Sequence, residues 1–113
     1  MDVEPVDERD SSWEVDTPRF RVYVFDSRNA TSCYDITGAE VLDVVRWAQE
    51  RCNDDERYAV ALVHDDRRSE NTRERGLIWL LGYDANTSDH DAVTEARLKA
   101  MHARAGQTIV LDE

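Results

Sequence analysis

The chain has 113 residues, of which 41% are hydrophobic and 35% charged, and its formal net charge is −11 at pH 7. This length predicts one domain with a modest core, and no stretch approaches the roughly 20 apolar residues of a membrane span. Such an acidic surface repels phosphate backbones and anionic lipids, which argues against direct binding to nucleic acid or to membranes.

The first sixteen residues contain more than half of the excess negative charge. Seven carboxylates and the single Arg9 give residues 1–16 a net charge of −6. We therefore expect 1–16 to be a mobile acidic tail and 17–113 to be the folded domain. Within the tail, Trp13 and Val15 either pack at the edge of the domain or form a short recognition segment. Because no basic and apolar leader opens the chain, we expect a cytoplasmic protein in which Cys33 and Cys52 are free thiols.

The first predicted elements are two antiparallel strands. Residues 19–26, RFRVYVFD, alternate, with Phe20, Val22 and Val24 on one face and Tyr23 and Phe25 on the other. A polar loop over 27–32 and a short strand over 33–36 complete a hairpin.

A helix is predicted over 37–52. Thr37 and Glu40 have the spacing of a capping box, and the apolar side chains fall on one stripe: Val41, Val44, Val45, Ala48 and Cys52. Trp47 lies outside this stripe. Either a neighbouring segment covers its indole, or Trp47 anchors a protein partner within a rim of carboxylates, since Trp is enriched at binding hot spots. That rim is formed by Glu40, Asp43, Glu50, Asp54 and Asp55.

Two further strands are predicted, over 57–65 and 76–84. The second, GLIWLLGYD, is almost continuously apolar, which predicts a central position in the sheet or an interface. Between them, residues 65–75 carry charges of both signs, and we expect a solvated loop.

A second helix is predicted to begin near Ser88 and Asp91, to run to about Arg104 and to end at Gly106. Residues 108–112 are a candidate last strand.

The order ββα–ββα–β predicts an α+β fold of two layers, with both helices on one face of an antiparallel sheet. The opposite face would then be uncovered. It would present Tyr23, Phe25 and Trp79, and would serve as a surface for a protein partner or a homodimer.

The sequence contains no catalytic motif, and we expect neither enzyme activity nor a cofactor. An alternative hypothesis is a small metal- or ligand-binding domain that uses His64, Asp66 and His90, because imidazoles and carboxylates are ordinary metal ligands.

The succession ITGAEVLDVVRWAQE, YAVALVHDD and GLIWLLGYDAN lies within residues 19–86. It resembles a pattern found in small uncharacterised actinobacterial and actinophage proteins. The resemblance brings no catalytic residues and implies a mobile, host-interaction kind of gene. Together with the charge, it favours a non-catalytic protein that binds a partner with a basic surface: an immunity protein, an antitoxin, or a phage anti-defence inhibitor that imitates nucleic acid.

Overall fold

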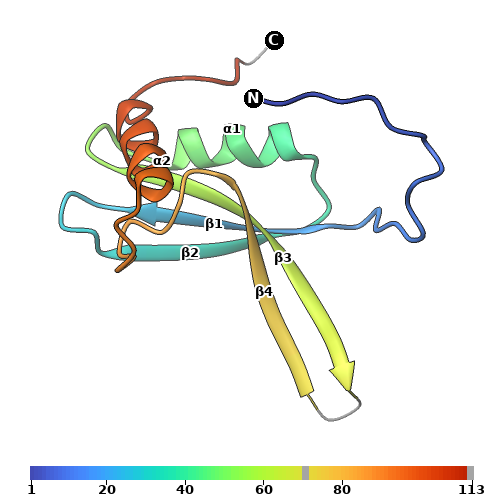
Figure 1. Cartoon of the computed structure of the whole chain (residues 1–113). Coiled ribbons are helices and arrows are strands. Elements are labelled where there is room, and N and C mark those ends of the chain that lie inside the picture. The colour runs from blue at the N-terminus through green and yellow to red at the C-terminus, as the bar shows by residue number, and fades with distance from the viewer. Residues whose placement is uncertain (70–71, 112–113) are drawn as a thin grey trace.

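The computed structural model describes residues 1–69 and 72–111, without the side chains of 66–69 and 72–74. Four strands form one antiparallel sheet in the order β2-β1-β3-β4. The elements are β1 (Arg19–Phe25), β2 (Thr31–Ile36), α1 (Val41–Arg51), β3 (Arg57–Ser69), β4 (Thr72–Leu81) and α2 (Ala92–Ala103) (Figure 1). The α+β class is confirmed. Among the described residues, no helix is long and apolar enough to cross a membrane.

Helix α1 covers one face of the sheet. The buried cluster between them joins Val44, Val45 and Ala48 of the helix to alternate residues of the strands, which are Phe20, Val22, Val24, Tyr58 and Val60. These helix residues belong to the stripe that the helical periodicity predicts, and Cys52 packs against the cluster, but Val41 of that stripe is 43% exposed. The helix nevertheless begins later than expected, because Gly38 adopts a left-handed φ of 73°. Glu40 is the N-cap, and its backbone N–H donates to the Asp43 carboxylate at 3.2 Å.

Helix α2 packs against the opposite face, so the prediction of both helices on one face is wrong. Its Met101 forms a buried cluster with Phe25 and Ala59. Phe25 follows Val24 in β1, and successive strand residues point to opposite faces of a sheet. The layers are therefore helix, sheet and helix, with α2 covering one end of its face (Figure 1). The physical reason is that the second face also carries apolar residues, and packing against α2 removes them from water.

The hairpin of β3 and β4 is much longer than expected. Strand β3 pairs with β1 only as far as Val63, and beyond that point it pairs with β4 alone. This part projects from the body of the molecule (Figure 1). The predicted loop over 65–75 is therefore wrong for 65–69 and 72–75, which are strand, while 70–71 lie outside the described residues. Asp65 and Arg75 face each other across the ladder and form an ion pair of 2.9 Å.

The predicted last strand over 108–112 does not form within its described part, 108–111. Instead, the side chain of Gln49 in α1 bonds this segment. Its carbonyl oxygen accepts the backbone N–H groups of Ile109 and Val110, both at 3.0 Å, and its amide donates to the Val110 carbonyl. One side chain thus supplies the hydrogen-bond partners that a neighbouring strand would provide.

The acidic N-terminal segment has neither helix nor strand over residues 1–16, and its side chains are exposed. In Figure 1 it leaves the start of β1 and arcs away from the sheet. Trp13 stacks on His64 with ring centroids 6.4 Å apart, yet it remains 68% exposed. The contact of Trp13 with the domain is therefore peripheral.

Candidate functional site

A row of aromatic side chains crosses the sheet on the face where α2 lies. Tyr23 of β1 lies 6.2 Å from Phe25 and 5.1 Å from Trp79 of β4, measured between ring centroids. Trp79 in turn lies 5.3 Å from Tyr83, which follows β4. These separations are within the range of favourable aromatic pairs. The row thus connects the middle of the sheet to its β4 edge.

Two alanines of β3 allow this row to form. In the antiparallel register Ala59 is paired with Tyr23 and Ala61 with Trp79. Both alanines are fully buried. Because their side chains are small, the large rings of β1 and β4 meet above the strand that separates them.

The ends of the row differ in exposure. Phe25 is 0% exposed, because Met101 and the other side chains of its cluster cover it. The prediction that Phe25 belongs to an uncovered patch is therefore wrong. Tyr23, Trp79 and Tyr83 are half-buried, and the Arg97 guanidinium of α2 lies 5.9 Å from the Tyr83 ring centroid. The accessible part of the row is the part toward β4.

An ion pair borders the row on the same face. The Arg21 guanidinium donates two hydrogen bonds to the Asp35 carboxylate, at 2.7 and 3.1 Å. These bonds lower the pKa of Asp35 and raise that of Arg21. Cys33 lies between Asp35 and the turn, paired with Tyr23 across the ladder, and is exposed.

Strand β4 is the edge of the sheet, so a central position, one of the two predicted for it, is wrong. The strand order gives it β3 as its single neighbour among the described strands. The segment from Leu77 to Leu81 carries no charge, and Ile78 and Leu80 are 50% and 46% exposed. The other prediction for this apolar run, an interface, stays a prediction.

Trp47 is half-buried, and the residue that contacts it is Tyr34 of β2. The two rings meet edge to face with centroids 5.1 Å apart. Arg51 is the third member of this cluster. Its guanidinium donates to the Tyr34 hydroxyl at 2.9 Å and lies over the Tyr34 ring. The indole also packs against the core cluster under α1. The structure thus gives Trp47 a packing role on the side of the sheet opposite the aromatic row.

The carboxylates predicted to surround Trp47 do not converge on its indole. Glu40 and Asp43 cap the start of α1, and Asp43 also contacts Arg46 at 3.4 Å. Glu50 is exposed near the end of the helix, and Asp54 and Asp55 are exposed in the turn that follows it. These carboxylates lie at both ends of α1 and do not form a ring around the Trp47 indole.

The residues of the alternative metal site have separate neighbours. His64 stacks on Trp13 at the start of the projecting hairpin, whereas His90 Nδ1 lies 3.1 Å from the Glu95 carboxylate before α2. The side chain of Asp66 lies outside the described part. Within that part, no group of three or more His, Cys, Asp or Glu side chains could hold a metal ion.

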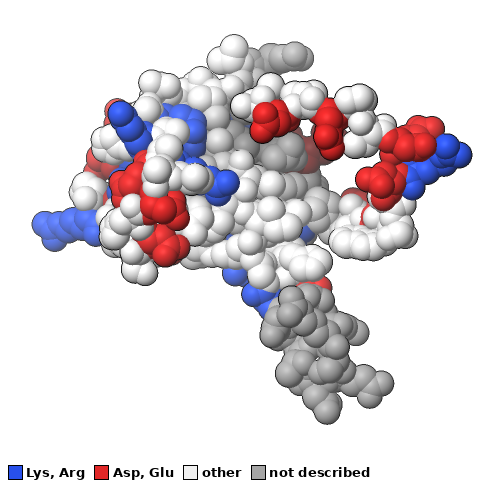
Figure 2. Space-filling model, in the orientation of Figure 1, with Lys and Arg blue, Asp and Glu red and all other residues white. Residues whose placement is uncertain are grey.

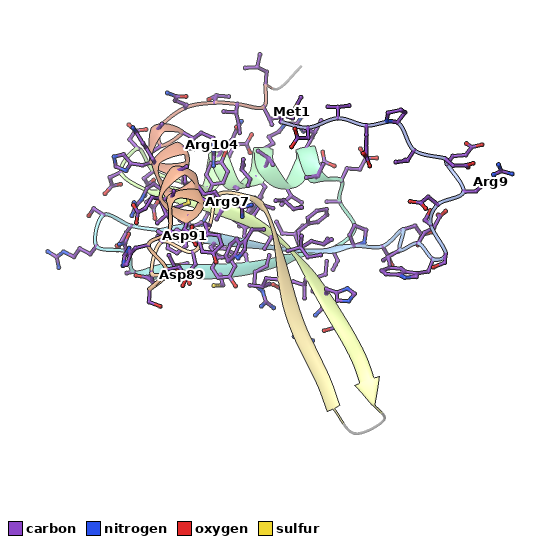
Figure 3. The ribbon with its side chains drawn as sticks, viewed as in Figure 1. Met1, Arg9, Asp89, Asp91, Arg97 and Arg104 are labelled. Carbon is purple, nitrogen blue, oxygen red and sulfur yellow. The ribbon has the colours of Figure 1, made fainter. Side chains whose placement is uncertain are left out.

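Charge is distributed unevenly around the aromatic face. Figure 2 shows acidic side chains along the N-terminal segment on one side and near the start of α2 on the other, with a largely uncharged surface between them. Asp89 and Asp91 lie at the N-terminal end of α2, and Arg97 and Arg104 lie farther along the chain (Figure 3). Asp91 caps the helix by accepting the Thr94 N–H at 2.8 Å, and this bond lowers its pKa.

Sequence reasoning finds Tyr23 and Trp79 but misses the roles of two tyrosines. Tyr34 alternates with Asp35 on a short strand, so its packing against Trp47 could have been read from the pairing of strands 19–26 and 33–36. Tyr83 lies four residues after Trp79 in the predicted strand over 76–84, so alternation would place it on the face of Trp79, although in the structure β4 ends at Leu81. Comparisons with protein-family models, curated proteins and solved structures give no match for this chain.

Proposed function

We propose that this chain is a non-catalytic binding protein that inhibits or neutralises a protein partner with a basic surface. The binding site is the β4 edge together with the accessible part of the aromatic row, formed by Tyr23, Trp79 and Tyr83. The observation that carries the proposal is the edge position of β4 together with its uncharged segment from Leu77 to Leu81, on which apolar side chains are exposed.

An edge of this kind is normally protected. Soluble proteins place lysines, prolines or bulges on edge strands, because an open edge pairs readily with another chain. From Leu77 to Leu81, β4 has no charge and no proline. A bulge is present where the register shifts opposite Val60 and Ala61, but the exposed residues beside it are Ile78 and Leu80. A partner that covers β4 would remove this apolar area from water.

The aromatic row provides anchors for such a partner. Trp and Tyr are over-represented among the residues that dominate binding energy, because they bury large areas while ordering few rotatable bonds. Trp79 and Tyr83 have half-buried rings that neighbouring rings and Arg97 hold in place. Rings that are already ordered lose less entropy on binding.

The charge selects the partner. A net charge of −11 and the acidic side chains of the N-terminal segment attract a basic protein and repel an acidic one, whereas acidic and basic side chains lie together on the side of α2 (Figure 2). An immunity protein, an antitoxin or a phage inhibitor that imitates nucleic acid would meet a basic target through such an acidic surface.

The test compares two tryptophan variants. Wild-type protein on a solid support captures partners from a bacterial lysate, and the affinity of the captured partner is then measured for Trp79→Ala and Trp47→Phe. Trp79→Ala should weaken binding by about 2 kcal/mol or more, which is about 30-fold. Trp47 packs against Tyr34 of β2 on the other face of the sheet, so Trp47→Phe, which keeps an aromatic ring there, should leave the affinity unchanged.

The alternative binding partner of the β4 edge is a second copy of the chain. Sedimentation equilibrium at several concentrations detects it directly. A dimer that Ile78→Lys converts to a monomer would place the β4 edge in a homodimer and would replace the foreign partner in the proposal. Equal affinities of the two tryptophan variants would contradict the proposed site altogether.

A further inference from the structure

A pocket of about 150 Å³ lies at the end of the molecule where both helices finish. It is lined by Gln49 and Cys52 of α1, by the turn that leads into β3, by Tyr58 at the start of β3, and by Arg104 and the residues after it. Figure 3 shows Arg104 at the C-terminal end of α2. None of the residues that line it belongs to the aromatic row, although Arg104 also lines a neighbouring pocket beside Trp79 and Leu80.

Two buried hydrogen-bonding groups in this pocket have no protein partner. Tyr58 is only 5% exposed, and its hydroxyl makes no hydrogen bond with the described residues. The same holds for Nε and Nη2 of Arg104, although both atoms are buried. Buried polar groups in proteins are nearly always paired, because an unpaired one loses its bonds to water without replacement. Tyr58 and Arg104 come from distant parts of the chain, so their convergence is not a local accident of one turn.

The chemistry of the donors indicates the ligand. The N–H groups on Nε and Nη2 lie on one edge of the planar guanidinium and match the two oxygens of a carboxylate. The Tyr58 hydroxyl adds a third donor. Burial raises the pKa of Tyr58, so the hydroxyl keeps its proton at neutral pH and can donate it.

The remaining walls restrict the ligand further. Asp54 and Glu56 also line the pocket, and Glu56 accepts the Asn53 N–H at 2.9 Å. Their negative charges repel any anion beside Arg104, but they repel a doubly charged phosphate about twice as strongly as a monocarboxylate. A cavity of roughly 150 Å³ can hold a ring the size of benzene.

We infer that this pocket binds a small monocarboxylate, held by two hydrogen bonds from Arg104 and one from Tyr58. The ligand is no larger than benzoate, and binding does not require the β4 surface. The pocket therefore adds a small-molecule site to a protein for which we propose a protein partner.

The test is a titration followed by two-dimensional amide NMR at neutral pH and constant ionic strength. Acetate and benzoate are the probes, and acetamide and benzamide are their neutral counterparts. Saturable shifts at residues 52–58 and 104–108 are expected with a carboxylate, with a dissociation constant of roughly 1 mM or tighter. The neutral amides should bind at least ~10-fold more weakly, because they lack the charge that strengthens the bonds.

Two variants and one matched control assign the site. Arg104→Met should weaken carboxylate binding by ~10-fold or more, and Tyr58→Phe, which removes a single oxygen, by several-fold. Lys99→Met removes a positive charge from α2 at an exposed residue that does not line this pocket, and it should leave carboxylate binding unchanged. If Arg104→Met does not fold, Tyr58→Phe still decides the question. The inference is overturned by the absence of saturable shifts, by equal binding of the amides, or by full affinity in a folded Tyr58 or Arg104 variant.

Discussion

Replacing Phe25 with alanine is the strongest test of the arrangement of the sheet and α2. The Phe25 side chain is 0% exposed and packs against Ala59 and Met101, so it attaches the second helix to the sheet. Truncating a buried phenylalanine destabilises a protein by about 3–5 kcal/mol, through lost burial and the cavity that remains. For a domain of this size each kcal/mol lowers the melting temperature by about 4 °C. Phe25→Ala should therefore lower it by about 12–20 °C.

The assay is thermal unfolding followed by circular dichroism, with Val93→Ala as the matched control. Val93 is also apolar and lies on α2, but it is 66% exposed, so its truncation should change the free energy of unfolding by less than about 0.5 kcal/mol. A fall of only a few degrees for Phe25→Ala would refute the reasoning. It would mean that α2 does not cover this face.

Three further predictions concern single side chains. Trp47→Ala should lower the free energy of unfolding by about 2 kcal/mol, less than for a fully buried Trp because the indole is half-exposed against Tyr34; an unchanged urea midpoint would contradict its packing role. The pKa of Asp35 is lowered in the folded protein, so its pairing stabilises the fold fully above the ordinary Asp pKa and is lost as the pH falls below about 4. In Asp35→Asn this acid-dependent part of the loss should disappear from the pH profile of the unfolding midpoint. Burial raises the pKa of Cys52 to about 11, so iodoacetamide at pH 8 should modify the exposed Cys33 first, and mass spectrometry showing equal rates would count against this burial.

The parts of the fold that can be predicted from the sequence are those in which apolar residues recur with a clear strand or helix period. The predicted strand over 19–26 alternates cleanly and the predicted helix over 37–52 has a single apolar stripe. The structure has a strand over Arg19–Phe25 and a helix over Val41–Arg51. The projecting hairpin carries charges of both signs without alternation, because a two-stranded ribbon beyond the core has no buried face to impose one. Its sequence therefore resembles a loop.

The sequence of α2 does not indicate which face of the sheet it covers. Its buried residues are only Thr94 and Met101, which are too few to mark an apolar stripe. The C-terminal segment has a strand-like composition, but its backbone bonds go to the Gln49 side chain. Among the site residues, strand alternation predicts the face on which Tyr23 and Trp79 lie. It does not predict the burial of Phe25, because this burial depends on a helix more than sixty residues away in the sequence.

Amide hydrogen exchange of the chain, free and bound to its captured partner, tests the central claim most directly. We propose that the partner lies along β4. Binding should then slow exchange at the amides of residues 76–83, which border the open edge and the aromatic row, and should leave α1 unchanged. Slower exchange confined to α1 and the turn at Asp54 would contradict this account and would support an interface centred on Trp47.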